Sequence, residues 1–168
     1  MCFPTTPLTR AGPRQPPADD EPTIDDRYAE VAGRVPAFAG VWVDGSRLMI
    51  GVTDGSAASA RAARDALVEM TGDRDLALRH PVPARATYPF DRLKTWYDPV
   101  AYEIMSLPGA VSSDIDEREN VLRFGFEEAE VIRGCVELIL GRIGVPDDAV
   151  VIEQQDPIRP VPLRAERS

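Results

Sequence analysis

The stretch that decides the fold runs from residue 111 to residue 153 and reads VSSDIDERENVLRFGFEEAEVIRGCVELILGRIGVPDDAVVIE. Two runs rich in β-forming residues flank a polar turn, in which Asn120 is expected to take a left-handed conformation. Apolar side chains then recur at helical spacing until Gly144 and Pro146 end the helix. The pattern predicts the order strand, strand, helix, strand, at residues 111–116, 121–126, 127–142 and 150–153.

An earlier stretch repeats this order. Asp44-Gly45-Ser46 is a hairpin turn signal, Asp54-Gly55-Ser56 ends a strand and is expected to cap a helix through Asp54, and Gly72 is a helix stop. The expected elements are strands at 41–43, 48–53 and 76–79, with a helix at 57–70. The two stretches look like a duplication, although a chance similarity of two such units would give the same pattern.

These elements predict an α+β fold with a body over residues 27–156. The body has two pseudo-repeated strand-strand-helix-strand units, at about 36–84 and 109–156, each with an antiparallel sheet. A helical connector over 88–107 links them. Because Pro99 cannot donate a backbone hydrogen bond, the connector is expected to form two short helices, 89–97 and 99–106.

Both ends of the chain read as tails. Residues 1–26 hold six of the sixteen prolines together with several acidic side chains. Such a segment has too little apolar surface to offset its ordering entropy, so disorder is expected there. Residues 157–168 form a second tail, rich in proline and arginine, which favours an extended path.

Composition excludes several classes of function. The chain has 168 residues, and its 28 acidic and 19 basic side chains give a net charge of −9, a sign that disfavours nucleic-acid binding. No apolar run is long enough for a membrane span, and no export signal is visible, so a cytoplasmic location is expected for the chain as given. A single histidine leaves little room for a metal centre, and no metal or cofactor is expected.

Two constellations carry possible chemistry. Thr53, within Gly51-Val52-Thr53-Asp54-Gly55, lies at an expected strand-to-helix turn and would need His80 as its base, which makes a small hydrolase the least favoured alternative. Asp114 and Asp116 belong to an oxygen-rich segment that resembles a calcium loop but lacks the glycine such a loop needs. A helix cap and a solvated hairpin explain these residues more simply, so no catalytic residue is expected.

Three blocks of sequence, taken in order, carry a family resemblance. They are PAFAGVWVDG followed by RLMIGVTD, GAVSSDIDERENV from Gly109 to Val121, and GVPDDAVV from Gly144 to Val151. The blocks span about residues 36–157. Together they resemble the non-catalytic pro-region of secreted bacterial chymotrypsin-like serine proteases, the alpha-lytic and streptogrisin group. No Gly-Asp-Ser-Gly block of the protease itself occurs in this chain.

The resemblance implies a protein-binding domain that acts as an intramolecular chaperone and inhibitor of such a protease, in a secreted or cell-surface setting. It implies that the sheet of the second unit extends the protease sheet by edge pairing, and that the C-terminal tail lies near the active-site cleft. The implied contact residues are Ile152, Glu153, Gln154, Gln155, Asp156, Pro157 and Ile158. The alternative is a stand-alone cytoplasmic interaction or scaffold domain with another partner.

Overall fold

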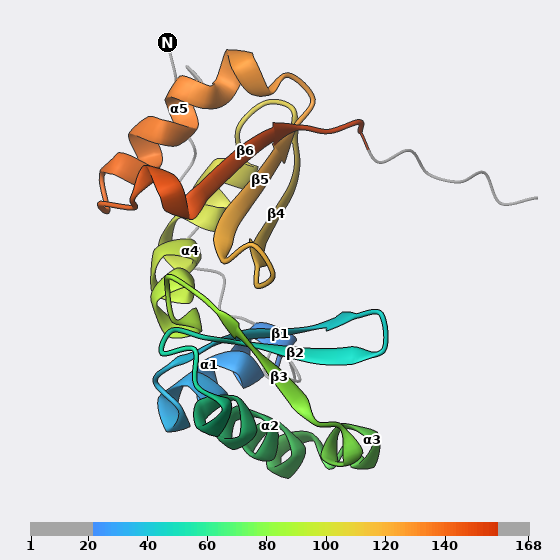
Figure 1. Ribbon diagram of the computed structural model, residues 1–168. Helices are drawn as coiled ribbons and strands as arrows, with labels where there is room; N and C mark the ends of the chain where they lie inside the picture. Colours follow the sequence, from blue (N-terminus) through green and yellow to red (C-terminus); the bar gives the residue numbers. More distant parts are fainter. Residues whose placement is uncertain (1–21, 158–168) are drawn as a thin grey trace, which may run out of the picture.

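The computed structural model describes residues 22–157 and contains two units of similar element order joined by a long helix (Figure 1). In the first unit a helix precedes a hairpin, two further helices and a return strand. The bounds of these elements are α1 Ile24–Arg34, β1 Phe38–Asp44, β2 Arg47–Val52, α2 Ala57–Thr71, α3 Arg74–Leu78 and β3 Pro81–Arg85.

The connector and the second unit complete the chain. The bounds are α4 Phe90–Met105, β4 Ala110–Asp116, β5 Val121–Phe126, α5 Ala129–Gly141, a 3-10 turn at Asp147–Ala149 and β6 Val150–Gln154. The expected α+β class is therefore confirmed. A duplication as the origin of the two units stays a prediction.

Each unit has a three-stranded mixed sheet, in the order β1-β2-β3 or β4-β5-β6. The two hairpins are antiparallel, as expected, whereas β3 pairs parallel to β2 and β6 pairs parallel to β5. The prediction of wholly antiparallel sheets is wrong for the third strands. The helix between the second and third strands carries the chain back to the end where the second strand began, so the third strand runs in the same direction.

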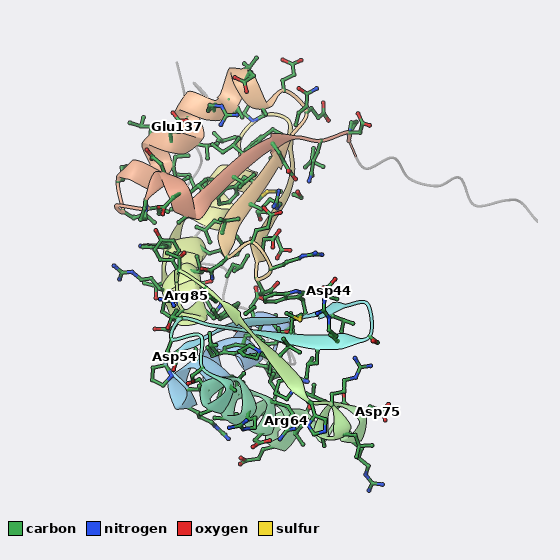
Figure 2. All side chains as sticks on the ribbon, in the orientation of Figure 1. Asp44, Asp54, Arg64, Asp75, Arg85 and Glu137 are labelled. Carbon is green, nitrogen blue, oxygen red and sulfur yellow. The ribbon has the colours of Figure 1, made fainter. Side chains whose placement is uncertain are left out.

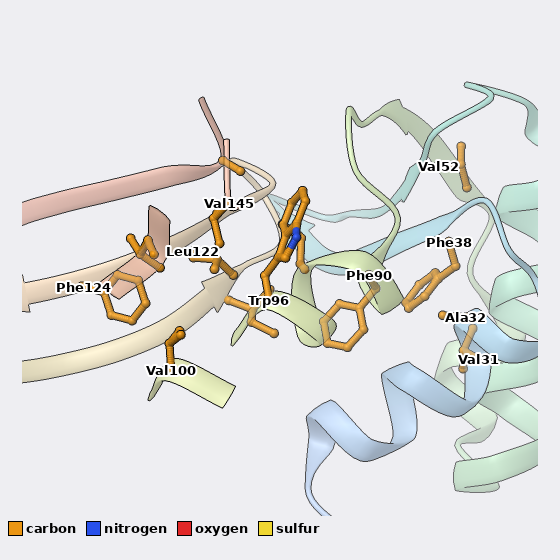
Figure 3. Close-up of a cluster of buried hydrophobic side chains, with 14 of the residues drawn as sticks. Val31, Ala32, Phe38, Val52, Phe90, Trp96, Val100, Leu122, Phe124 and Val145 are labelled. Carbon is orange, nitrogen blue, oxygen red and sulfur yellow. The ribbon is translucent and has the colours of Figure 1, made fainter. Parts of the chain in front are cut away.

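The hydrophobic core continues from one unit into the other through α4 (Figure 3). Helices α1 and α2 cover one face of the first sheet, and α5 covers one face of the second (Figure 1). Phe90 packs towards Phe38 of β1, at a ring separation of 6.2 Å, and Tyr97 stacks on Phe124 of β5 at 6.4 Å. One helix therefore supplies core side chains to both units.

The connector is one helix of 16 residues with Pro99 in its interior, so the expected break is wrong. Phe90, Leu93, Trp96, Val100 and Ile104 form an unbroken buried stripe along α4. Burial of each large apolar side chain contributes about 1.5–3 kcal/mol. The stripe together outweighs the roughly 3 kcal/mol that a proline costs inside a helix.

The strand expected at 76–79 is also wrong. Asp73 caps the short helix α3 there, because its carboxylate accepts the backbone N–H groups of Asp75 and Leu76 at 2.9 and 3.0 Å. The third strand instead begins at Pro81 and includes Pro83, the residues expected to close it. Prolines are tolerated because β3 is an edge strand.

The N-terminal tail was expected to reach residue 26, but α1 starts at Ile24. A capping box fixes this start: the Thr23 hydroxyl accepts from the Asp26 N–H at 3.2 Å, and the Asp26 carboxylate accepts from the Thr23 N–H at 3.0 Å. Val31 of α1 is fully buried in the first unit. Residues 1–21 and 158–168, which hold the rest of the two expected tails, lie outside the described residues.

Charged side chains lie on the outside of this arrangement, as Asp44, Arg64 and Glu137 illustrate (Figure 2). Within residues 22–157, none of the helices is long and apolar enough to cross a membrane. The candidate site lies on the second sheet, at its edge strand β6.

A candidate protein-binding edge on the second sheet

Strand β6 pairs with β5 along one side only. The N–H of Gln155, just beyond the strand, donates to the Phe126 carbonyl at 2.8 Å. Backbone groups alternate in direction along a strand, so Val151 and Glu153 also face β5, whereas Ile152 and Gln154 face outward. The outward positions present backbone N–H and C=O groups to an incoming strand.

One outward carbonyl already has a protein partner. The guanidinium of Arg133, on α5, donates to the Ile152 carbonyl at 3.3 Å and to the Glu130 carboxylate at 3.0 Å. This contact agrees with the outward direction deduced for Ile152. A charged side chain that covers part of an edge strand is a known protection against unwanted pairing. Arg133 therefore blocks part of the outer edge of β6.

The equivalent edge of the first unit is closed by prolines. Pro81 and Pro83 lie opposite Leu48 and Ile50 of β2. The Ala86 N–H donates to the Val52 carbonyl at 3.2 Å, so alternation places both prolines at outward positions. Proline has no N–H, and β3 therefore cannot donate to an added strand there.

The corresponding residues of β6 are Val150 and Ile152, which lie opposite Leu122 and Phe124 of β5. Both retain the backbone N–H, but that of Val150 donates to the Asp147 carbonyl of the preceding 3-10 turn, so only that of Ile152 is left at the edge. Their side chains pack partly against the core, which holds the strand in place while its outer backbone edge faces away from β5.

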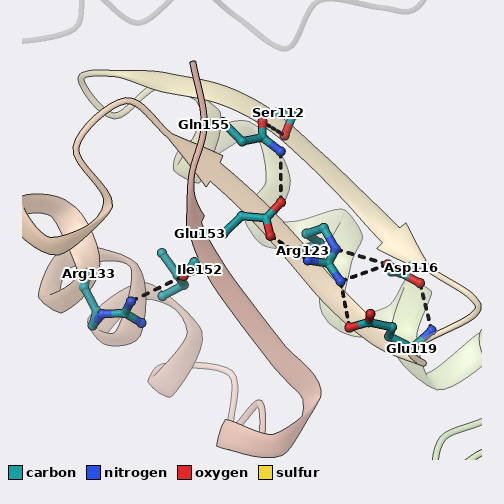
Figure 4. Close-up of polar contacts among 8 residues, drawn as sticks. All are labelled: Ser112, Asp116, Glu119, Arg123, Arg133, Ile152, Glu153 and Gln155. Atoms are coloured by element: carbon teal, nitrogen blue, oxygen red, sulfur yellow. Dashed lines mark hydrogen bonds and ion pairs between the residues drawn. The ribbon is translucent and has the colours of Figure 1, made fainter. Parts of the chain in front are cut away.

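On the other face of the sheet, a chain of polar contacts crosses all three strands (Figure 4). The Ser112 hydroxyl of β4 donates to the Gln155 side-chain oxygen at 2.7 Å, and the Gln155 amide donates to Glu153 at 3.0 Å. Glu153 in turn accepts from Arg123 of β5 at 2.7 Å. We call these four residues the polar ladder. The ladder ties β6 and the residue after it to the strands that hold the core.

Arg123 is the centre of this ladder. Its guanidinium also contacts the carboxylates of Asp116 at 3.0 Å and Glu119 at 2.8 Å. Burial alone would lower the pKa of Arg123, but the hydrogen bond to Asp116 and the attraction of Glu153 and Asp116 raise it overall. Arg123 is therefore a fixed cation that holds three carboxylates together.

Gly125 allows the ladder to lie flat on the sheet. A Cβ at this position would overlap with the side chains of Gln155 and Ser112. The glycine therefore lets Gln155 cross β5 and reach Ser112 at van der Waals distance from the backbone.

Of the remaining expected contact residues, Gln154 ends β6, and Asp156 and Pro157 extend away from the sheet. Gln154, Asp156 and Pro157 are exposed, and the chain leaves β6 with no further secondary structure through Pro157. Ile158 lies outside the described residues. The described part of the expected contact segment is therefore an edge strand that leads into an exposed extension.

The structure separates the two residues of the alternative hydrolase. Thr53 follows the end of β2, and its N–H donates to the Ala37 carbonyl at 2.8 Å. His80 precedes Pro81, which pairs with Leu48 at the beginning of β2. The length of the paired strands, roughly 16 Å, lies between them. Thr53 and His80 therefore cannot form the hydrogen-bonded pair that a nucleophile and its base require.

The two aspartates considered for a cation have protein partners. Asp116 accepts from Arg123 and from the Glu119 N–H at 2.8 Å, while Asp114 accepts from the Ile115 N–H at 2.9 Å. Among residues 22–157, no three acidic, histidine or cysteine side chains are grouped so that they could hold a metal ion.

No protein-family model matches this sequence, and a search of curated proteins finds no significant match. The assignment of the candidate site therefore rests on the geometry of β6 and its neighbours. Sequence reasoning did not find Arg123 and Arg133, which organise the edge. Their partners depend on strand register and helix placement, and no local motif marks them.

Proposed function

We propose that this chain is a non-enzymatic protein-binding domain that receives an extended strand of its partner at β6. Such strand addition gains affinity from backbone hydrogen bonds and specificity from the side chains that flank them. The observation that carries the proposal is the contrast between the two return strands: prolines close the outward positions of β3, whereas Ile152 and Gln154 keep their N–H groups on the outer side of β6.

The partner that fits best is a chymotrypsin-like serine protease, as a pro-region of chaperone and inhibitor type would have. The family resemblance of the sequence motivates this choice, and two features of β6 fit a partner that adds a strand. The edge is pre-organised by the polar ladder, which lowers the ordering cost of binding. The exposed residues Asp156 and Pro157 continue beyond the sheet and can follow the surface of the partner towards its cleft.

The test uses one backbone position. Q154P removes the outward N–H while leaving the bonds to β5 intact, and Q154A removes the side chain but keeps the N–H. The measurement is inhibition and assisted refolding of an alpha-lytic or streptogrisin-type protease encoded near this chain. We expect Q154A to act like the wild type and Q154P to bind at least about tenfold more weakly, since one hydrogen bond contributes about 1 kcal/mol and the ring adds a clash.

Two results would overturn this proposal. One is an inability of the wild-type chain to bind the protease or to change its refolding yield. The other is equal binding by Q154P and Q154A, which would place the interface elsewhere on the molecule.

A further inference from the structure

The turn between β4 and β5, residues 117–120, reaches across to the first unit (Figure 1). Its first residue, Glu117, packs against Gly40 in the irregular part of β1. Gly40 has a φ of 133°, a backbone conformation that favours glycine. A Cβ at Gly40 would also overlap with the Glu117 side chain. Glycine at this position is what allows the turn to dock.

The last residue of the same turn makes a second contact. Asn120 is buried and has a φ of 60°, the left-handed conformation expected from the sequence. Its side-chain oxygen accepts from the N–H groups of Thr87 and Tyr88 at 2.9 and 2.7 Å, and its amide donates to the Tyr88 carbonyl at 2.8 Å. The turn is therefore held at both ends, by β1 and by the segment that precedes α4.

The surroundings of Glu117 are negatively charged. Asp114 and Asp116 approach from β4, and Asp25 approaches from α1 together with the phenol of Tyr28. The nearby cations have other partners: Lys94 is paired with Asp98 at 3.1 Å and with Asp26 at 3.6 Å. Arg123 is held by the carboxylates described above. Arg118, the neighbour in the chain, is exposed.

These surroundings favour the protonated carboxyl of Glu117. Burial raises the pKa of Glu117 to about 7, and Asp114, Asp25 and Asp116 add to the rise, against a smaller opposing effect of the backbone N–H. The pKa values of two neighbouring groups are raised as well. Burial, followed by Glu117 and Asp25, raises the pKa of Tyr28 to about 12, and burial also raises the pKa of Asp25, against the influence of Lys94.

We propose that the 117–120 turn is a proton-controlled clasp between the two units, closed while the Glu117 carboxyl is protonated and released when it ionises. While the turn is docked against Gly40, an ionised Glu117 carboxylate would be half-buried near other carboxylates, which is unfavourable. Movement of the turn into solvent would hydrate this carboxylate. Because Asn120 belongs to the same four-residue turn, its bonds to Thr87 and Tyr88 open in the same event.

The direction of the pH dependence follows from proton linkage. The closed turn holds its proton up to about pH 7, whereas an exposed glutamate loses it near its ordinary value of 4.5. Opening is therefore accompanied by proton release between these values. The opening equilibrium rises by up to roughly tenfold per pH unit in this window and levels off above it.

Hydrogen exchange at the Thr87 and Tyr88 amides measures the opening directly, after correction for the intrinsic pH dependence of exchange. We expect these amides to lose protection by roughly tenfold or more from pH 5 to 7 in the wild type. E117Q, which cannot ionise, should keep constant protection over that range. E119Q is the matched control, because Glu119 lies in the same turn but pairs with Arg123 and is exposed; it should behave like the wild type.

A second measurement does not depend on a variant. The side-chain carboxyl of Glu117, followed by carbon NMR in the wild-type chain, should titrate near pH 7. A midpoint below about 5.5, near the ordinary value for glutamate, would overturn the proposal. Equal pH dependence of exchange in E117Q and the wild type would overturn it as well.

Discussion

The return strands β3 and β6 occupy the same place in the two units, yet their outer edges differ. Each pairs parallel to the middle strand of its sheet. Outward positions hold Pro81 and Pro83 in β3, but Val150 and Ile152 in β6. The Val150 N–H donates to the Asp147 carbonyl within the chain, so the pairing-competent part of the β6 edge begins at Ile152, whereas prolines close the edge of β3.

The outer faces of the two sheets also differ. In the first sheet Trp42 lies opposite Met49, and in the second sheet the equivalent pair is Asp114 and Arg123. The first sheet is covered by apolar side chains at this point, whereas the second has an arginine that draws three carboxylates together. The charged arrangement fixes β6 from outside the core.

We expect the largest loss of stability from a proline at Gln155, and a much smaller loss from a proline at the neighbouring Gln154. Q155P removes the N–H that donates to the Phe126 carbonyl and disturbs the polar ladder, so we expect it to lower the free energy of unfolding by about 3 kcal/mol. Q154P acts at an outward N–H and should cost less than about 1 kcal/mol. Urea denaturation of both variants measures the difference. Equal losses would show that the deduced direction of β6 is wrong.

The next largest effect concerns the centre of the polar ladder. R123M gives β5 the residue found at the equivalent place in β2 and leaves Asp116, Glu119 and Glu153 without their shared cation. We expect a loss of about 2 kcal/mol at low salt, reduced for the partial exposure of these groups. The loss should shrink in concentrated salt, which screens the repulsion. A loss that does not depend on salt would indicate that packing, and not charge, holds the ladder.

A smaller effect should appear in the pH dependence of stability. The folded-state pKa of Glu117 is raised from 4.5 to about 7, so its contribution to stability is complete below pH 4.5 and is lost as the pH rises through 7. We expect the difference in unfolding free energy between the wild type and E117Q to change by about 1–2 kcal/mol over this window, after discounting for partial exposure. Thermal denaturation of both proteins at pH 5 and pH 7.5 would reveal it.

The smallest effect on stability concerns the guard of β6. R133A removes a long, partly buried contact to the Ile152 carbonyl and should cost about 0.5 kcal/mol or less. It should also raise self-association, because an outward carbonyl becomes available for pairing. Sedimentation over a range of concentrations tests this, with R142A as a control, since Arg142 pairs with Glu103 away from the edge. Unchanged association in R133A would contradict the guarding role.

The second unit could be predicted closely because its signals are local. Strand β5 has the expected bounds, and α5 lies within the expected helix, since alternation and helical spacing are read from adjacent residues. The errors arose where packing over long distances decides. The stripe from Phe90 to Ile104 continues α4 through Pro99, and the edge position of β3 accommodates Pro81 and Pro83.

Some features of the candidate site could be predicted from the sequence, and others could not. The edge strand and its extension were expected through the family resemblance, and β6 is an edge strand in the structure. Arg123, Arg133 and the contact of Glu117 with Gly40 were not expected. Each joins residues far apart in the sequence, and strand register or the placement of the units must be known before such a pair can be seen.

The central claim is that a partner strand pairs with β6, and hydrogen exchange at the Ile152 and Gln154 amides tests it most directly. Both N–H groups face outward in the free chain, so they should exchange readily when the protein is alone and become protected when the protease is bound. Protection that develops along β4 or on the first sheet, with the amides of Ile152 and Gln154 unchanged, would contradict the account.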